Sequence, residues 1–309
     1  MDFCSAYVIP PLPAGEDTIV LFISYLDQRK LSGRSTRVYL SALRSLHLDE
    51  GFAPPCIATP RIKRMLRAMD ISGVPPRQKL PITLDILSLM LSVMPPGYDG
   101  YVFKSAMSLA FFGCLRAAEL CVTGHAFDPL RHLTLMDVQV VALEAATAVK
   151  VCIKRSKTDH VNQGFSVTLK CISTSVCAHC ALLNMHFARH QSGLSVLPTS
   201  PLFLFGDASY LTKFTFVKQT RYLLQLAGFD PDGYSGHSFR AGCATSAAQA
   251  GFSDWEIQLL GRWSSSAYHR YIRASPSLLA SLAHRLATQQ RVPQQHPACT
   301  STVNMFQHS

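Results

Sequence analysis

The chain has 309 residues, 48% of them apolar, and a formal net charge of +10. This length and composition exclude a wholly disordered chain and suit two domains with cores of their own, while the charge favours a polyanionic partner. We expect no signal peptide and no membrane span, since the richest apolar run, residues 105–115, is too short to cross a bilayer. Ten scattered cysteines favour a reducing compartment over a disulfide framework.

The first 72 residues are predicted to form a small helical module behind an irregular lead-in over residues 1–16. From Asp17, apolar residues recur with the spacing of one helix face. A break at Ser32 and Gly33 follows, and Ser35 is expected to cap a second helix. The residues expected to face inward on this second helix are Tyr39, Leu43 and Leu46.

A third helix is predicted over residues 60–70, and it presents a basic face. Its cationic residues are Arg61, Lys63, Arg64 and Arg67. They are candidate contacts to a polyanion, although ordinary solvation of a surface helix explains the same pattern. Residues 73–80 contain two consecutive prolines, which stiffen a linker and indicate a domain boundary.

The rest of the chain combines helices with a short β-rich region. Helices are predicted over residues 84–94, 101–120, 181–192 and 211–227. Three runs rich in β-branched residues within residues 133–171 predict a three-stranded antiparallel sheet, and residues 156–164 form the turn between its last two strands. A leucine-faced helix begins near Ser275, and the polar residues 289–309 are typical of a disordered tail. The fold class is therefore mainly α with a small antiparallel sheet.

Residues 236–273 concentrate side chains that suit a phosphate group. Ser235 is expected to cap a helix whose first turn holds His237 and, three residues later, Arg240; free amide groups there favour an anion. A capping box at residues 253–256 starts a second short helix. The aromatic residues that follow, among further cations, are Trp263, Tyr268 and Tyr271.

The ordered series H-x-x-R, G-R-W and Y-I-R in this stretch resembles the tyrosine recombinase (phage integrase) family. The spelling HSFRAG…LGRWSSSAYHRYIR is most similar to recombinases of eukaryotic DIRS/Ngaro-type retrotransposons and cryptons. Upstream, FFGCLRAAEL carries the R-x-x-E-L of the family's first arginine motif. The resemblance implies a helical core-binding domain over residues 1–72, a linker over 73–80 and an α+β catalytic domain over 81–288 that clamp DNA together.

The resemblance also implies roles for individual residues. Arg116 and Arg240 would bind the non-bridging phosphate oxygens, as forked guanidinium groups do. His237 would exchange a proton, and Glu119 would fall at the acidic position that orients the histidine. Tyr271 would be the nucleophile that forms a 3′-phosphotyrosine. The remaining implied catalytic residues are Lys157, the acid for the 5′-oxygen, and Trp263, a hydrogen-bond donor.

Three of these assignments have close competitors in the sequence. Lys154 and Arg155 lie within three residues of Lys157. Many relatives have histidine where this chain has Arg262, so either Arg262 replaces it or Trp263 acts one residue later. Tyr268 nearly shares a helix face with Tyr271; the resemblance favours Tyr271, which begins Tyr-Ile-Arg and lies at the expected distance after the histidine/tryptophan position.

Three cysteines and three histidines form a cluster in the sequence that invites comparison with a zinc site: Cys171, Cys177, His179, Cys180, His186 and His190. Only five residues separate Cys180 from His186, whereas a zinc finger needs a longer reach between its ligand pairs. The same stretch matches the family's C-x-x-x-A-L entry into a helix, where the cysteine packs. We therefore expect no metal site.

The function predicted from the resemblance is cleavage and rejoining of double-stranded DNA by a nuclear recombinase or integrase of a mobile element. Because the covalent link retains the energy of the phosphodiester bond, we expect no cofactor. The expected assembly is a homotetramer on DNA, without a membrane. Two alternatives stay open: a catalytically silent DNA-binding protein on the same fold, and an enzyme resembling type IB topoisomerases.

Overall fold

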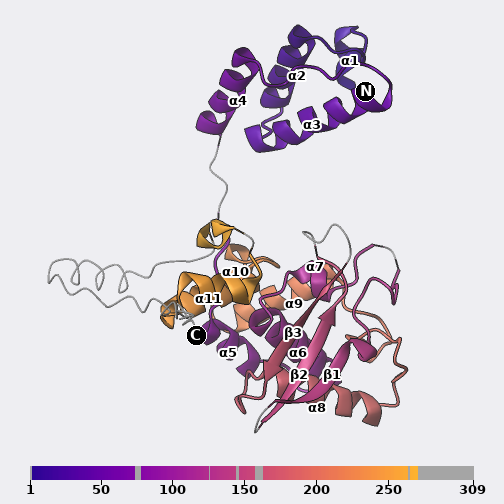
Figure 1. Cartoon of the computed structure of the whole chain (residues 1–309), viewed down its shortest axis with the longest axis vertical. Coiled ribbons are helices and arrows are strands. Elements are labelled where there is room, and N and C mark those ends of the chain that lie inside the picture. Colours follow the sequence, from indigo (N-terminus) through magenta and orange to yellow (C-terminus); the bar gives the residue numbers. More distant parts are fainter. Residues whose placement is uncertain are drawn as a thin grey trace, which may run out of the picture. The chain divides into compact units, whose positions relative to one another are not determined.

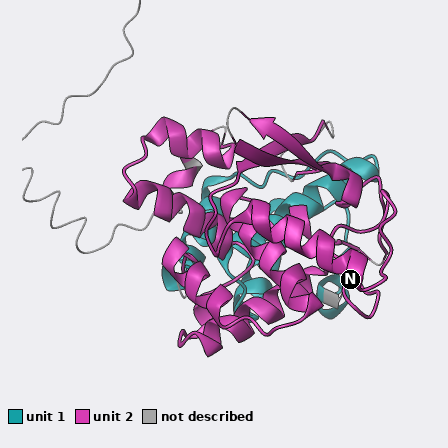
Figure 2. Ribbon diagram, turned by 90° about the horizontal axis from the view of Figure 1, so that it is seen from below, with its two compact units in different colours: residues 1–78 teal, residues 79–309 magenta. Residues whose placement is uncertain are grey.

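The computed structural model describes residues 2–73, 78–124, 126–143, 146–156, 163–263 and 265–270. The chain divides into two compact units, Met1–Gln78 and Lys79–Ser309, which Figure 2 colours separately. Each unit has its own cluster of buried apolar residues. No helix in the described residues is long and apolar enough to cross a membrane.

The first unit consists of helices (Figure 1). They are α1 (Asp2–Tyr7), α2 (Glu16–Gln28), α3 (Gly33–Asp49) and α4 (Pro60–Ser72). Helices α2, α3 and α4 contribute the buried residues of the core. These include Ile19, Ile23, Leu40, Ile62 and Leu66. Helix α4 begins where sequence rules place it, with the Thr59 hydroxyl accepting the Ile62 N–H and proline in the first turn.

The expected irregular lead-in is wrong in part, because residues 2–7 form helix α1, while residues 8–15 are irregular. Phe3 is buried, and its ring lies 5.0 Å from the ring of Phe22 and 5.2 Å from that of Tyr25, both on α2. These aromatic contacts hold a helix too short to be stable in isolation. Tertiary packing therefore decides the conformation of this segment.

The inward face expected for the second helix is also wrong in part. Helix α3 begins at Gly33 with Ser32 as its cap, and Tyr39 and Leu46 are 50% and 44% exposed. Its buried face includes two polar residues, Thr36 and His47, whose hydrogen bonds are internal: His47 Nε2 accepts the Ala14 N–H at 2.8 Å. A pattern of apolar residues alone does not reveal such a face.

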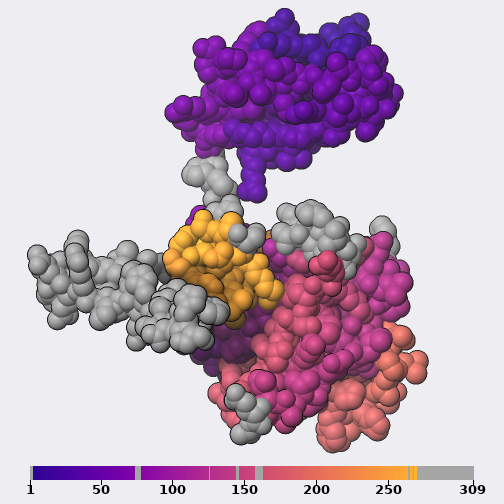
Figure 3. Space-filling view, viewed as in Figure 1, coloured from indigo at the N-terminus to yellow at the C-terminus, as the bar shows by residue number. Residues whose placement is uncertain are grey.

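The second unit surrounds a central helix with further helices and a sheet (Figure 1). Its α-helices are α5 (Leu84–Ser92), α6 (Tyr98–Phe112), α7 (Ala117–Leu120), α8 (Ala178–Gln191), α9 (Lys213–Leu226), α10 (Ser238–Gln249) and α11 (Asp254–Gly261). Its 3-10 helices are η1 (Leu135–Asp137), η2 (Pro231–Gly233) and η3 (Ser266–Arg270). Helix α6 is buried along most of its length. In the space-filling view α11 forms part of the surface (Figure 3), where Trp255 is 68% exposed.

The expected sheet is confirmed. Strands β1 (Val138–Leu143), β2 (Ala146–Ile153) and β3 (Phe165–Lys170) pair antiparallel in the order β1-β2-β3. The register places Val151 opposite both Val138 and Val167. Alternate residues of β2, including Val149 and Val151, are fully buried against the core that contains α6.

One predicted helix is two. The segment expected to be helical over residues 101–120 breaks after Phe112, and α7 starts only at Ala117. Cys114 has a positive φ of 48°, which an α-helix does not accommodate, and Arg116 is extended. The break turns the carbonyl groups of Gly113 and Cys114 outward from the helix ladder, where arginine side chains bind them.

Helix α10 is held against the start of the second unit by close backbone contact. The Ile82 N–H donates to the Ser238 carbonyl at 2.9 Å, and the Leu84 N–H donates to the Ser246 hydroxyl at 3.0 Å. A Cβ atom at Gly242 would overlap the Ile82 carbonyl, so only glycine allows this approach. These contacts between residues 82–84 and α10 fix the position of Arg240, which lies on the same helix.

Candidate active site

Arg116 caps α7 and is held by an acidic partner on the same helix. The Arg116 N–H donates to Glu119 Oε2 at 2.8 Å, and its Nη1 donates to Glu119 Oε1 at 2.8 Å and to Ser156 Oγ at 3.1 Å. The Glu119 side chain is only 2% exposed, so the pair is well shielded from solvent. Within the described residues, Nη2 and Nε of Arg116 have no hydrogen-bond partner, and they remain able to fork onto an anion.

Glu119 was expected to orient the histidine. Its hydrogen bonds in the structure run instead to Arg116 and to the Ser156 hydroxyl, which donates to Oε1 at 2.9 Å. The carboxylate therefore ties α7 to the end of β2. The ion pair between Arg116 and Glu119 and the hydrogen bonds of both residues to Ser156 together fix the guanidinium of Arg116.

Arg240 is a buried cation fixed on three sides. Its side chain leaves α10, Nη1 donates to the Cys114 carbonyl and Nη2 to the Gly261 carbonyl, each at 2.5 Å. The guanidinium carbon lies 4.4 Å from the ring centroid of Trp263, a cation–π contact. At 1% exposure, Arg240 contributes a positive charge in a region of low dielectric, where a nearby phosphate would feel it strongly.

Arg262 and Trp263, the two candidates for one role, both contact this cluster. Arg262 ends α11 with a left-handed φ of 54°, and its Nη1 and Nη2 donate to the carbonyl groups of Gly113 at 3.0 Å and Cys114 at 3.3 Å. Burial lowers the pKa of the Arg262 guanidinium, and the charges of Arg240 and Arg116 act in the same direction. Arg262 thus joins the cationic cluster, while Trp263 covers Arg240.

His237 lies at the N-terminus of α10 with its side chain exposed. The expected cap is displaced: the Ser235 hydroxyl accepts the His237 N–H at 3.3 Å, and the helix begins at Ser238. A Cβ at Gly236 would lie 3.0 Å from the Cβ of Ala117, so this turn packs directly on α7. His237 therefore lies where the N-termini of α7 and α10 approach each other.

The two competing tyrosines differ in what the structure can say of them. Tyr268 is 3% exposed and packs with Ile257 and Trp263, its ring centroid 5.9 Å from that of Trp263. Burial raises the pKa of Tyr268, and the Asp254 carboxylate acts in the same direction, which reduces the phenolate fraction at neutral pH. Tyr271 lies outside the described residues.

Lys157 also lies outside the described residues, but its competitor Lys154 is accounted for. The Lys154 ammonium is 2.6 Å from Asp137 Oδ2 and donates to the carbonyl groups of Pro129 and His132. These partners tie Lys154, just after β2, to the segment that leads into β1. Ser156, which precedes Lys157 in the sequence, is bound to Arg116 and Glu119.

The basic face expected on α4 is exposed, opposite the buried residues Ile62, Leu66 and Met69. Its four cations are Arg61, Lys63, Arg64 and Arg67. Arg61 forms a surface ion pair with Asp17 at 2.7 Å, an interaction that typically contributes about 0–1 kcal/mol. Lys63, Arg64 and Arg67, for which no ion pair is found within the described residues, are therefore the better candidates for binding an anion.

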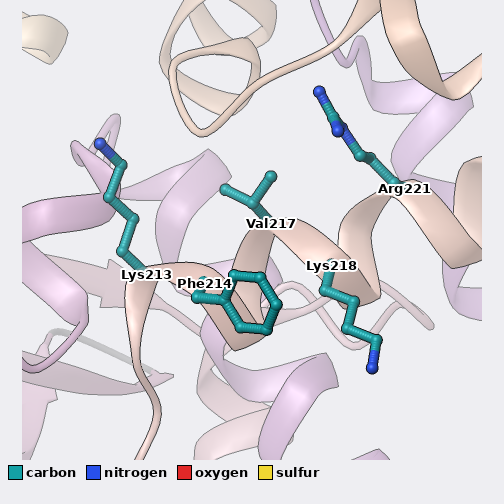
Figure 4. A pocket seen from close by; sticks show the side chains of 5 residues that line it. All are labelled: Lys213, Phe214, Val217, Lys218 and Arg221. Atoms are coloured by element: carbon teal, nitrogen blue, oxygen red, sulfur yellow. The ribbon is translucent and has the colours of Figure 1, made fainter.

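A second basic surface, on α9, was missed from the sequence. A groove of about 530 Å³ lies along this helix. Its lining side chains, shown in Figure 4, are Lys213, Phe214, Val217, Lys218 and Arg221. Lys213, Val217 and Arg221 recur every four residues and form one row, and the apolar ring of Phe214 is 76% exposed beside them. Val217 also approaches Gly236, so the groove borders the turn that carries His237.

Comparison with known proteins gives one curated relative and several solved structures. The chain is 27% identical over 281 residues to an integrase/recombinase xerD homolog of Selenomonas ruminantium, covering 88% of this chain and 77% of that one. No protein-family profile matches. A XerH site-specific recombinase bound to difH DNA superposes with a TM-score of 0.60 and 18% identity over 87% of this chain and 72% of that one. The Tn1549 transposon integrase in complex with transposon right-end DNA superposes with a TM-score of 0.55 and 15% identity, covering 90% and 87%.

Proposed function

We propose that this chain, which has the fold of the tyrosine recombinases and a XerD-like integrase/recombinase as a relative, is a site-specific DNA recombinase or integrase. One observation carries the proposal. Arg116, Arg240 and Arg262 come from three separate elements and meet at the turn after α6, where Arg116 keeps two donors available for an anion. A phosphodiester group is the anion that suits such a cluster.

The proposed reaction needs no metal ion. Arg116 binds non-bridging phosphate oxygens, while the buried charge of Arg240 stabilises the negative charge of the pentacoordinate transition state. The phenolic oxygen of Tyr271 attacks phosphorus and gives its proton to His237, the bond from phosphorus to the 5′-oxygen breaks, and Lys157 donates the proton that this oxygen gains. The 3′-phosphotyrosine is then attacked by a 5′-hydroxyl, which reverses the steps on another strand.

Covalent trapping tests this proposal. The intact protein is mixed with nicked duplexes from a library of candidate sites, with no added divalent cation. Cleavage close to the nick releases the short strand that carries the new 5′-hydroxyl, so the covalent complex cannot rejoin it. We expect a protein–DNA adduct that survives denaturing electrophoresis. Firm DNA binding without any adduct would contradict the proposal and favour the catalytically silent protein.

We also propose that DNA binds along the α9 groove and the basic face of α4. Each paired phosphate contributes about 0.9 to the slope of log K against log salt concentration. The Lys213→Ala/Arg221→Ala and Arg64→Ala/Arg67→Ala variants are each expected to lower this slope by about 1.8. Fluorescence anisotropy over a salt series measures the slopes.

The matched control for these variants is Arg131→Ala, which removes a 60% exposed arginine that pairs with Asp128 outside both surfaces. Its slope is expected to equal that of the unmodified protein. A double variant whose slope is unchanged would show that the basic surface it alters is solvated and does not bind DNA phosphates.

Gly261→Ala is expected to slow adduct formation by about 100-fold, because displacing a positioning group by roughly 1 Å can have this effect. The new Cβ would overlap the six-membered ring of Trp263, which must then leave the face of Arg240. Rates come from quenched time courses on the trapping substrate. Gly15→Ala is the control, since its Cβ meets no atom within 4 Å, and equal rates for the two variants would contradict a role for the Trp263 contact.

Two finer proposals rest on this function. The motif spelling between His237 and Arg273 supports an origin in a eukaryotic mobile element, and hence action in the nucleus. We also propose a homotetramer on DNA that carries two sites. Mass photometry on such DNA separates a tetramer from a monomer that relaxes supercoils alone, as an enzyme resembling type IB topoisomerases would.

A further inference from the structure

Four possible metal ligands gather where β3 leads into α8. Cys171 directly follows β3, Cys177 precedes the first residue of α8, and His179 and Cys180 lie in the first turn of that helix. One ligand atom from each side chain lies within 4.8 Å of all the others. The chain thus brings three thiols and an imidazole together from two elements.

The spacing of these atoms fits a tetrahedral ion. The Sγ atoms of Cys171 and Cys180 are 3.5 Å apart, and Cys180 Sγ is 3.8 Å from His179 Nδ1. Zinc–sulfur bonds of about 2.3 Å at tetrahedral angles place two sulfurs roughly 3.8 Å apart. The Ile172 N–H also points at Cys177 Sγ, at 3.4 Å, as outer donors do toward a ligating thiolate.

Burial gives a second, independent indication. His179 is 5% exposed, and its Nε2 is buried without a hydrogen-bond partner among the described residues. Its Nδ1 lies 3.8 Å from Cys180 Sγ and has no oxygen or nitrogen partner among the described residues. A buried imidazole whose nitrogens lack oxygen or nitrogen partners is costly, and binding a metal ion removes part of that cost.

We propose that Cys171, Cys177, His179 and Cys180 bind one structural zinc ion. Thiolate and imidazole ligands favour zinc, and four protein ligands leave no open position for catalysis. The sequence-based expectation of no metal rested on the short gap between Cys180 and His186. In the structure His186 is an exposed residue further along α8, and the strand residue Cys171 completes the set instead.

The position of the ion sets its role. Strand β3 runs from the turn that contains Lys157 to Cys171, six residues or roughly 20 Å. Zinc at its far end would tie the sheet to α8 without touching the phosphate site. Metal binding is therefore independent of the proposed recombinase function and needs no DNA to be measured.

The test uses the full chain, purified under reducing conditions without chelator. Elemental analysis is expected to find one zinc per chain, and Co²⁺ exchanged into the site is expected to give the intense visible absorption of tetrahedral thiolate coordination. Cys171→Ser and Cys180→Ser should each weaken zinc binding at least about 100-fold, since even outer-shell changes weaken it 10–100-fold. Cys152→Ser is the matched control, a half-buried thiol on β2 beside Ser166 that should keep its zinc.

Three results would overturn the proposal. The first is that the reduced, folded protein takes up neither zinc nor Co²⁺. The second is that both cluster variants retain zinc. The third is that mass spectrometry finds a Cys171–Cys180 disulfide in place of metal in the protein purified under reducing conditions. Circular dichroism of each variant separates loss of a ligand from loss of the fold.

Discussion

Replacing Tyr271 with phenylalanine is expected to abolish the covalent adduct with DNA while leaving DNA affinity nearly unchanged. Only the attacking oxygen is removed, so the variant lacks the nucleophile while the cationic groups that bind the phosphate remain. The choice of Tyr271 gains support from its neighbour, because Tyr268 is buried beside Trp263, and this burial, with a further contribution from Asp254, raises its pKa. The trapping assay and anisotropy on the same DNA give the two readouts.

Tyr268→Phe is the matched control, since it deletes the same atom three residues away. This variant is expected to form the adduct at a rate close to that of the unmodified protein. An adduct that disappears with Tyr268→Phe and persists with Tyr271→Phe would reverse the assignment of the nucleophile.

Replacing Arg116 is expected to have the second-largest effect. Arg116→Ala should slow strand cleavage by about 10²–10³-fold, the usual loss when one preorganised donor to a transition-state oxygen is removed. The physical reason is that Nη2 and Nε are the donors still available at the anion, while Nη1 is bound by Glu119 and Ser156. Single-turnover cleavage of the nicked substrate measures the rate.

Removing Arg116 also leaves the carboxylate of Glu119 buried without its cation, which can reduce stability. Arg116→Lys keeps a charge beside Glu119 but lacks the forked geometry, so it separates phosphate binding from folding. We expect Arg116→Lys to fold normally and to cleave slowly. A lysine variant that cleaves at the full rate would contradict bidentate phosphate binding by Arg116. The control variant Arg131→Ala is expected to leave the rate of strand cleavage unchanged.

Much of the fold could be predicted where local rules decide the structure. The Ser253–Glu256 capping box starts α11 as expected, and the three β-rich runs form the predicted antiparallel sheet. The motif also identified Arg116 and Arg240, which the structure brings to the same turn although 124 positions separate them in the sequence.

What could not be predicted depends on tertiary contacts. At the break between α6 and α7 two carbonyl groups bind arginines from α10 and from the end of α11, whereas the apolar pattern of residues 101–120 runs straight through this break. The zinc proposal needed Cys171, whose proximity to α8 follows from the path of β3. The groove on α9 could have been found, since Lys213, Val217 and Arg221 recur every four residues.

Mapping the adduct to one tyrosine tests directly whether this chain cleaves DNA through a phosphotyrosine intermediate at Tyr271. The trapped protein–DNA complex is digested with nuclease and trypsin, and mass spectrometry locates the remaining nucleotide. Trypsin separates the two candidates, because residues 263–270 contain Tyr268 and residues 271–273 contain Tyr271. We expect a phosphodiester-linked nucleotide on Tyr271. A nucleotide on Tyr268, or on no tyrosine, would contradict this assignment of the nucleophile.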